Sequence, residues 1–126
     1  MYSVDATLSE VDLSNTDLSG ANLRGADLSG SDLSSTNLSG ANLDGPNLRD
    51  SKLEDANLRD TNLTGAALHG AQLTHLISIE GSDFTEISGL SDESAEYLSS
   101  IAKGSHPETY RQTAESLNNL AVSENP

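Results

Sequence analysis

The sequence predicts an all-β solenoid, and three regularities between residues 6 and 75 support this prediction. Fourteen leucines occur at a strict spacing of five, from Leu8 to Leu73. The residue two places before each leucine is mostly Ala, Ser or Thr, and the residue between them is Asp or Asn in ten of the fourteen repeats. A polar residue and often Gly follow each leucine. Internal repetition of this kind is typical of solenoid architectures.

A spacing of five excludes the simple regular elements. In an α-helix, five residues turn through about 500°, so the leucines would spiral over every face. In a straight strand, side chains alternate with a period of two, so every second leucine would face solvent. The pattern therefore requires one turn of the chain per repeat, which a polar residue followed by Gly supplies.

A corner near 90° after each repeat closes a square coil from four repeats, or 20 residues. Within each repeat, the small residue and the leucine share the inner face, and the residue between them points outward. Stacked coils then pair their backbones and share a core. This explains a stable fold with only 34% hydrophobic residues, a composition that by itself approaches that of disordered chains.

The repeats resemble those of the pentapeptide repeat family. The likeness is carried by Ala-Asn-Leu-Arg-Gly (21–25), Ala-Asp-Leu-Ser-Gly (26–30) and Ala-Asn-Leu-Asp-Gly (41–45), and it extends from Ala6 to His75. This resemblance implies a right-handed quadrilateral parallel β-helix.

The five-residue register breaks at 75–76 and is restored by one inserted residue, Leu76. We expect a bulge or a widened corner there, followed by the repeats Ile77–Gly81 and Ser82–Glu86. This gives sixteen repeats and about four coils. The predicted core consists of the central residue of each repeat: Leu8, Leu13, Leu18, Leu23, Leu28, Leu33, Leu38, Leu43, Leu48, Leu53, Leu58, Leu63, Leu68, Leu73, Ile79 and Phe84.

The pattern becomes helical beyond Gly89, which divides the chain into a β-helix at 1–89 and a C-terminal helical cap and tail at 90–126. Ser91 is a candidate N-cap, and Gly104 a candidate stop. A second short helix is expected from Thr113. A solenoid needs its open end covered, and the apolar residues predicted to cover the last coil are Leu90, Leu98, Ile101, Leu117 and Leu120.

The segment 98–117 is similar to the helical cap of pentapeptide repeat proteins from cyanobacteria and chloroplasts, although His106 and Tyr110 depart from that pattern. This resemblance implies the thylakoid lumen or periplasm. Met1 to Val4 contain no basic and apolar leader. The expectation is therefore a mature segment in one of those compartments, with the cytoplasm as the alternative.

Stacking at 20 residues predicts outward columns on the sides of the solenoid. Asp12, Asp32, Lys52 and Gln72 are expected in one column, and Asn22, Asn42 and Asn62 in another, where they could form an amide ladder. Arg24 is expected to pair with Asp44. Pro46 has no amide hydrogen, so we expect one hydrogen bond to be missing from the ladder between neighbouring coils.

The residues suggest no catalytic, cofactor or metal site. The chain has no Cys, which excludes disulfides and thiolate chemistry. Its histidines, His69, His75 and His106, do not have the local spacing of metal ligands. No apolar run is long enough to insert into a membrane, and a net charge of −14 disfavours nucleic acid.

These features favour a non-enzymatic scaffold that binds an unidentified protein partner and is a monomer. Any self-association is expected end to end, through the N-terminal coil from Ala6 to Leu23. The family resemblance also implies an alternative, an acidic DNA mimic that binds a type II topoisomerase. Half of the net charge lies in residues 77–126, and four basic residues interrupt the acidic faces of the solenoid, both of which weigh against mimicry.

Overall fold

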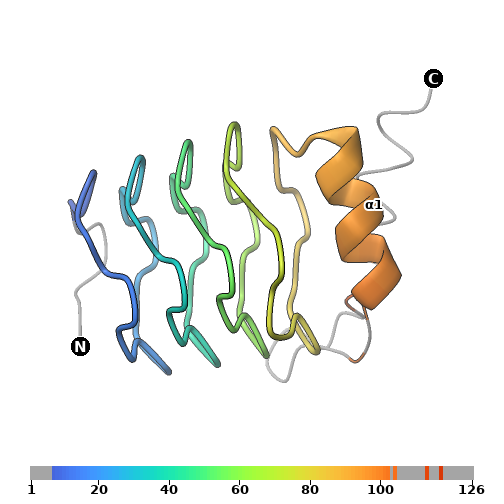
Figure 1. The fold of residues 1–126 in the computed structure, drawn as a ribbon, viewed down its shortest axis with the longest axis horizontal. Coiled ribbons are helices and arrows are strands. Elements are labelled where there is room, and N and C mark those ends of the chain that lie inside the picture. The colour runs from blue at the N-terminus through green and yellow to red at the C-terminus, as the bar shows by residue number, and fades with distance from the viewer. Residues whose placement is uncertain (1–6, 103, 105–112, 114–116, 118–126) are drawn as a thin grey trace.

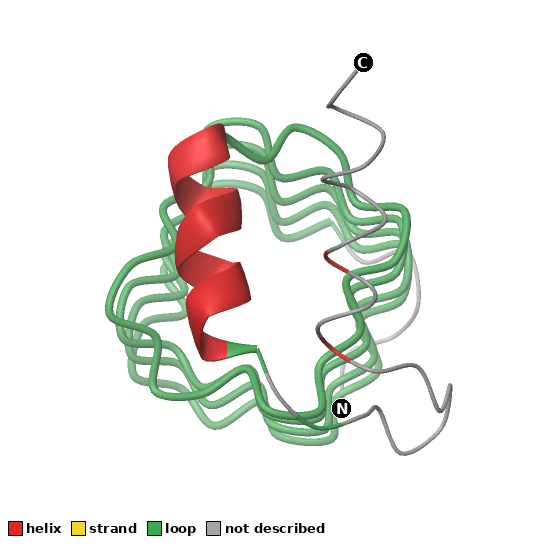
Figure 2. Ribbon diagram, turned by 90° about the vertical axis from the view of Figure 1, so that its right-hand side faces the viewer, coloured by secondary structure: helices red, strands yellow, loops and turns green. Residues whose placement is uncertain are grey.

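The computed structural model describes residues 7–102, 104, 113 and 117. The chain winds into a four-sided solenoid, and helix α1 (Asp92–Ile101) lies across its C-terminal end (Figures 1 and 2). Thirteen parallel bridges join neighbouring coils, from Thr7↔Asp27 to Ala67↔Ser88. Each is an isolated bridge between the outward residues of two repeats, because each side of a coil is too short for a longer strand.

Every corner is built by the fifth residue of a repeat, which has a left-handed backbone. Glycine fills seven of these corners between Gly20 and Gly70, with φ between 67° and 74°. Eight corners carry another residue type with φ between 52° and 61°: Glu10, Asn15, Ser35, Asp50, Asp55, Asp60, His75 and Glu86. This backbone costs an L-residue about 1–2 kcal/mol, so the corner geometry is imposed by the stacked coils even where the local residue disfavours it.

The backbone hydrogen bonds follow one scheme in the regular repeats. The leucine N–H donates to the outward residue of the next coil, as in Leu33 to the Lys52 carbonyl at 2.8 Å. The corner N–H donates to the next coil as well, as in Gly40 to Arg59. The outward residue donates to the preceding coil, and the small inner residue donates within its own coil to the preceding leucine, as in Ala41 to Leu38. The coils therefore satisfy most of their buried backbone internally, as burial requires.

The leucines from Leu13 to Leu73 are buried, and those from Leu18 to Leu48 are fully enclosed. Ile79 and Phe84 are buried in the same interior, at 1% and 0% exposure. Leu8 is only partly buried against the core, since no described coil precedes it. The small inner position also accepts hydroxyls, because a leucine carbonyl lies within reach of each. Ser31 donates to Leu28 at 2.6 Å, and Thr61 donates to Leu38 at 2.9 Å.

Pro46 does not interrupt the ladder between coils, contrary to the expectation from sequence. Its carbonyl accepts from Ala67 at 3.1 Å, and Asn47 donates to Ala26 at 2.9 Å. The amide at this repeat position normally closes the corner within its own coil. Proline therefore removes the turn hydrogen bond to Leu43, and the stacking of the coils is unaffected.

The insertion is a bulge, but the extra residue is Ile77 and not Leu76. Bridged partners are 20 residues apart up to Lys52↔Gln72 and 21 apart from Asn57↔Ser78 onward. In a regular repeat, one outward residue both donates to the preceding coil and accepts from it. Opposite Asn57 these two bonds are divided between two residues, because Ile77 donates to Ala56 and Ser78 accepts from Leu58. Such a two-against-one arrangement defines a β-bulge. Leu76 therefore takes the inner position at 9% exposure, and Ile77, expected to be inner, is 69% exposed.

Helix α1 begins at the N-cap Ser91, whose hydroxyl accepts from the Ser94 amide at 3.2 Å. Asp92 and Glu93 occupy the first turn, where the helix dipole favours acids. Leu98 is fully buried against the end of the solenoid core. The helix ends at Ile101, before the expected stop at Gly104, because Ala102 already has an extended backbone.

Of the residues predicted to cover the last coil, Leu90, Leu98 and Leu117 are buried, and Ile101 packs partly buried against the core. Thr113, the candidate start of a second helix, is also buried. Leu120 and most of the segment after 104 lie outside the described residues. Among the helices of the described part, none is long and apolar enough to cross a membrane.

Candidate interaction surface

The bridges place the outward residues in four columns along the sides of the solenoid. Asp12, Asp32, Lys52 and Gln72 form one continuous column, as the spacing predicts. Asn22, Asn42 and Asn62 form another, and Asp83 extends it. Side chains in a column therefore follow one another at the spacing of stacked strands, about 4.8 Å. Each side of the molecule therefore carries an ordered row of mostly polar side chains, with Ala67 as an apolar member and Asp83 buried.

The asparagines in this column do not form the expected amide ladder. Each side-chain oxygen instead accepts from the backbone two residues ahead, as in Asn42 Oδ1 from the Asp44 amide at 3.1 Å. Asn62 does the same for Thr64. This bond satisfies the one amide of a repeat that no backbone carbonyl accepts, namely that of the residue after the leucine. The preference for Asp or Asn therefore has a structural cause that the spacing alone does not reveal.

Four aspartates of the N-terminal half are held by the serine two residues later: Asp12, Asp17, Asp27 and Asp32. The Ser14 hydroxyl, for example, donates to Asp12 Oδ1 at 2.6 Å, and the Ser14 amide donates to the same oxygen at 3.0 Å. The serine hydroxyl, followed by the serine amide, lowers the pKa of each of these carboxyls. The N-terminal half thus presents fixed, ionised carboxylates.

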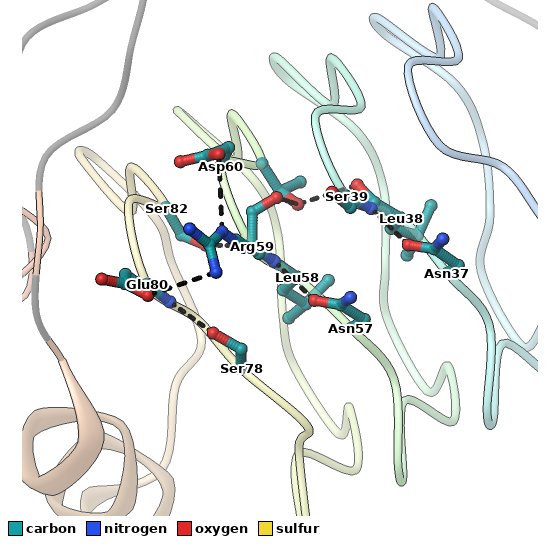
Figure 3. A network of polar contacts seen from close by, with 11 residues as sticks. Asn37, Leu38, Ser39, Asn57, Leu58, Arg59, Asp60, Ser78, Glu80 and Ser82 are labelled. Carbon is teal, nitrogen blue, oxygen red and sulfur yellow. Dashed lines mark hydrogen bonds and ion pairs between the residues drawn. The ribbon is translucent and has the colours of Figure 1, made fainter.

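In the C-terminal half, charged residues follow several of the leucines, although the hydroxyls of Thr64 and Thr85 still donate to Asn62 and Asp83. Arg59 Nη1 lies 3.5 Å from Glu80 Oε1 of the next coil, and Arg59 Nε lies 3.8 Å from Asp60 Oδ2 (Figure 3). The side chains are 39–56% exposed, so these ion pairs contribute little to stability. The expected pair of Arg24 with Asp44 does not form within 4.0 Å, and Arg59 makes the ion pairs found in the described segment.

A pocket of about 360 Å³ lies where the bulge meets the end of α1. It is lined by Leu76, Ile77, Ser78, Ile79, Glu80, Ser100, Ile101 and Ala102. The Tyr97 hydroxyl accepts from the Leu76 amide at 2.9 Å and joins the helix to the bulge. Nothing in the sequence indicated this contact, because the two residues are 21 positions apart and belong to different patterns.

A second pocket near the other end is lined by Ser9, Glu10, Asp27, Ser29, Gly30 and Asp50. Its three carboxylates do not converge as metal ligands would, and within residues 7–102 and the three later described positions no such group of three occurs.

His69 lies over the backbone of Gly89, and His75 occupies a left-handed corner. His106 lies outside the described residues. The described histidines are thus separated by their places in the repeat.

Comparisons with known proteins agree with this geometry. The family model described as "Pentapeptide repeats" matches residues 6–45 and 41–75 in eight copies. A pentapeptide repeat protein from the Arabidopsis thaliana thylakoid lumen is 32% identical, with a TM-score of 0.67 over 90% of this chain and 81% of that one. The pentapeptide repeat protein Rfr23 from the cyanobacterium Cyanothece 51142 is 38% identical, with a TM-score of 0.57. That match covers 68% of this chain and 54% of Rfr23.

These structural neighbours imply a right-handed quadrilateral β-helix, in agreement with the four-sided stacking seen here. Among curated proteins, none matches the chain.

Proposed function

Because the chain belongs to the pentapeptide repeat family, we propose that it is a non-enzymatic scaffold that binds a protein partner through the sides of its β-helix. The observation that carries this proposal is that the positions of the repeat have different structural roles. The inner residue, the leucine and the corner build the solenoid, and the Asp or Asn caps its backbone. The side chain of the residue after the leucine lies outside the core, and it is exposed in several repeats, among them Arg24, Arg49 and Arg59, so it is available for recognition.

The residue after the leucine differs between the two halves of the solenoid. In the first coils it is mostly Ser, and these serines are occupied by neighbouring aspartates. In the later coils it is Arg49, Glu54 and Arg59, which are exposed on three successive sides of the solenoid. On one of these sides Arg59 lies beside Asp60 and Glu80. Charges of both signs held together in this way suit a protein partner of complementary charge pattern, since such patterns mainly provide specificity and orientation.

The proposed architecture has about four coils made of sixteen repeats in residues 1–89, followed by a cap in residues 90–126. The cap role of α1 is supported by its position across the last coil and by the full burial of Leu98. A covered C-terminal edge cannot pair with another chain, which supports a monomeric scaffold at low concentration. No cofactor is proposed, since the interior of the described coils is filled by leucine and small residues.

We place the protein in the thylakoid lumen or periplasm, with the cytoplasm as the alternative. The support is the likeness to a thylakoid-lumen protein over most of both chains. Fractionation of the native organism, followed by immunodetection, tests this placement. Recovery in the lumenal or periplasmic fraction supports it, and recovery with cytoplasmic markers overturns it.

The scaffold function is tested by photo-crosslinking in the native organism, with a photoreactive residue at position 59 and a control at position 19, two coils earlier on the same side of the solenoid. A specific adduct from position 59 that disappears when Glu80→Lys is added, beside it in the next coil, supports a charge-patterned partner surface. Equal adducts from both positions, unaffected by that substitution, contradict it.

The DNA-mimic alternative has a separate test in a gyrase supercoiling assay. The scaffold proposal expects no inhibition by the purified protein at micromolar concentration. Inhibition that is lost when Asp12, Asp17, Asp27 and Asp32 are replaced by Asn would favour the mimic instead.

A further inference from the structure

The two ends of the solenoid differ in which backbone groups have partners among the described residues. At the C-terminal end, α1 lies across the last coil (Figure 1). At the N-terminal end, the first coil donates its leucine and corner amides to the second coil, as in Leu13 to Asp32 at 2.8 Å and Asn15 to Ser34 at 3.0 Å. The groups of the first coil that face the other way have no partner among the residues the structure describes.

The hydrogen-bond scheme of the inner coils identifies those groups. Asp32 turns both its N–H and its C=O toward the preceding coil, where it donates to Val11 and accepts from Leu13. The outward residues of the first coil occupy the same repeat position, so Thr7, Asp12 and Asp17 turn both groups toward the N-terminal edge. An edge residue that presents a donor and an acceptor together is half of a hydrogen-bonded antiparallel pair.

Such an edge is complementary to itself. A two-fold axis perpendicular to the solenoid reverses the direction of the chain and brings the same type of residue opposite, so that both hydrogen bonds can be exchanged. A head-to-tail arrangement would instead require the C-terminal edge of a second copy, and α1 occupies that place. A closed two-fold dimer is therefore compatible with the capped chain, whereas an open filament is not.

We infer that the N-terminal coil is a self-association surface, and that a second copy of the chain pairs with it head to head and antiparallel. Apolar exposure at the same edge supports this. Val11 occupies an inner position, yet it is 36% exposed because no described coil covers it. Leu8 is partly buried for the same reason. A second copy would cover both side chains.

Charge makes the association dependent on salt. The first coil carries Glu10, Asp12 and Asp17 against the single base Arg24, so two such edges repel one another at low ionic strength. Screening at 0.1 M salt and above reduces this repulsion, since the Debye length falls to about 10 Å. The dimer should therefore form at high protein concentration and become stronger as salt is added.

Sedimentation velocity over a concentration series, at low and at high NaCl, is the first test. We expect a monomer–dimer equilibrium that shifts toward dimer with salt. Val11→Lys places a charge on the edge and should abolish the dimer, whereas Ile77→Lys, at the other exposed large apolar residue, should leave it unchanged. A chain that stays monomeric at every concentration and salt level overturns the inference, and so does a dimer that is lost equally with both variants.

Cross-linking tests the orientation, and the absence of native Cys makes single-cysteine variants unambiguous. With a short bismaleimide, Thr7→Cys or Asp12→Cys should give cross-linked dimers, whereas Ser99→Cys on α1 should give none. A mixture of Asp12→Cys and Ser99→Cys should give no mixed dimer. Mixed dimers, or dimers from Ser99→Cys alone, would contradict the head-to-head arrangement. Circular dichroism of each variant checks that the fold is retained.

Discussion

The backbone amide of Leu76 donates to the hydroxyl of Tyr97 at 2.9 Å, and this contact joins the bulge of the solenoid to helix α1. In a regular repeat, the amide of the inner residue closes the corner on the preceding leucine. At the bulge, that amide is directed to the helix instead. The helix therefore supplies the hydrogen-bond acceptor that the Leu76 amide lacks within its own irregular repeat.

Replacing Tyr97 by Phe tests this connection. Leu76 is buried at 9% exposure, so its amide would lose its partner without full access to water. We expect a loss of about 1–3 kcal/mol in the free energy of unfolding, measured with urea. Ser99→Ala, at an exposed position of the same helix, is the control and should change stability little. Equal stability of Tyr97→Phe and the parent chain would show that the contact does not stabilise the fold.

The position of a leucine along the solenoid should determine its contribution to stability. Leu38 is fully enclosed between coils, and Leu38→Ala should cost about 2–5 kcal/mol in chemical denaturation. Leu8→Ala, in the partly open first coil, should cost clearly less. A neutral Leu38→Ala would refute the assignment of the leucines to the core.

The left-handed corners predict substitutions of opposite sign at one repeat position. Ser35 has φ 57°, and Ser35→Gly should stabilise the chain by about 0.5–1 kcal/mol, because relief of the backbone strain exceeds the entropy cost of glycine. Gly45 has φ 73° and open space where a Cβ would lie, so Gly45→Ala should destabilise by about 1 kcal/mol through strain alone. Thermal and urea unfolding of both variants measure the change in the free energy of unfolding, which should be positive for Ser35→Gly and negative for Gly45→Ala. A destabilising Ser35→Gly would mean that the corner is not strained.

The aspartate–serine pairs predict a loss of stability in acid. The pKa values of Asp12, Asp17, Asp27 and Asp32 are lowered in the folded chain, whereas the unfolded value is about 3.9. Their contribution is therefore present above the unfolded pKa and is lost as the pH falls through the lower, folded values. Urea unfolding between neutral and strongly acidic pH measures this.

Replacing Ser14, Ser19, Ser29 and Ser34 by Ala provides the matched comparison. It removes the largest cause of the shifts and should flatten the dependence of stability on pH below the unfolded value. An unchanged pH profile would show that the serines do not hold these carboxylates in solution.

The sequence indicates much of the fold because a single period dictates it. A leucine every five residues can be buried only if the chain turns at each repeat, and this places Leu13 and Leu73 in the same interior. The start of α1 is likewise local, since Ser91 and the acids after it specify an N-terminus. The end of the helix is not, because Ala102 becomes extended without a Gly or Pro beside it.

The details of the bulge could not be predicted from the repeat. Leu76 and Ile77 are both large and apolar, so the sequence does not specify which one is the extra residue. The distant Tyr97 hydroxyl accepts the Leu76 amide and favours Leu76 inside, and Ile77 is then left exposed. For the candidate surface, the columns follow from the spacing of 20. The role of Asn42 as a backbone cap does not follow from this spacing. An asparagine side chain would lie in the same column whether it bonded its own repeat or the next coil.

The most direct test of the central claim, a β-helical scaffold closed at its C-terminal end by α1, is sedimentation velocity of a chain that ends at Leu90. Without α1, the last coil would expose the core around Phe84 and its unpaired edge. We predict that the shortened chain associates or aggregates at a concentration where the full chain is a monomer. A shortened chain that remains monomeric with unchanged unfolding free energy would contradict the claim, and the C-terminal segment would then have to be explained as a partner-binding element.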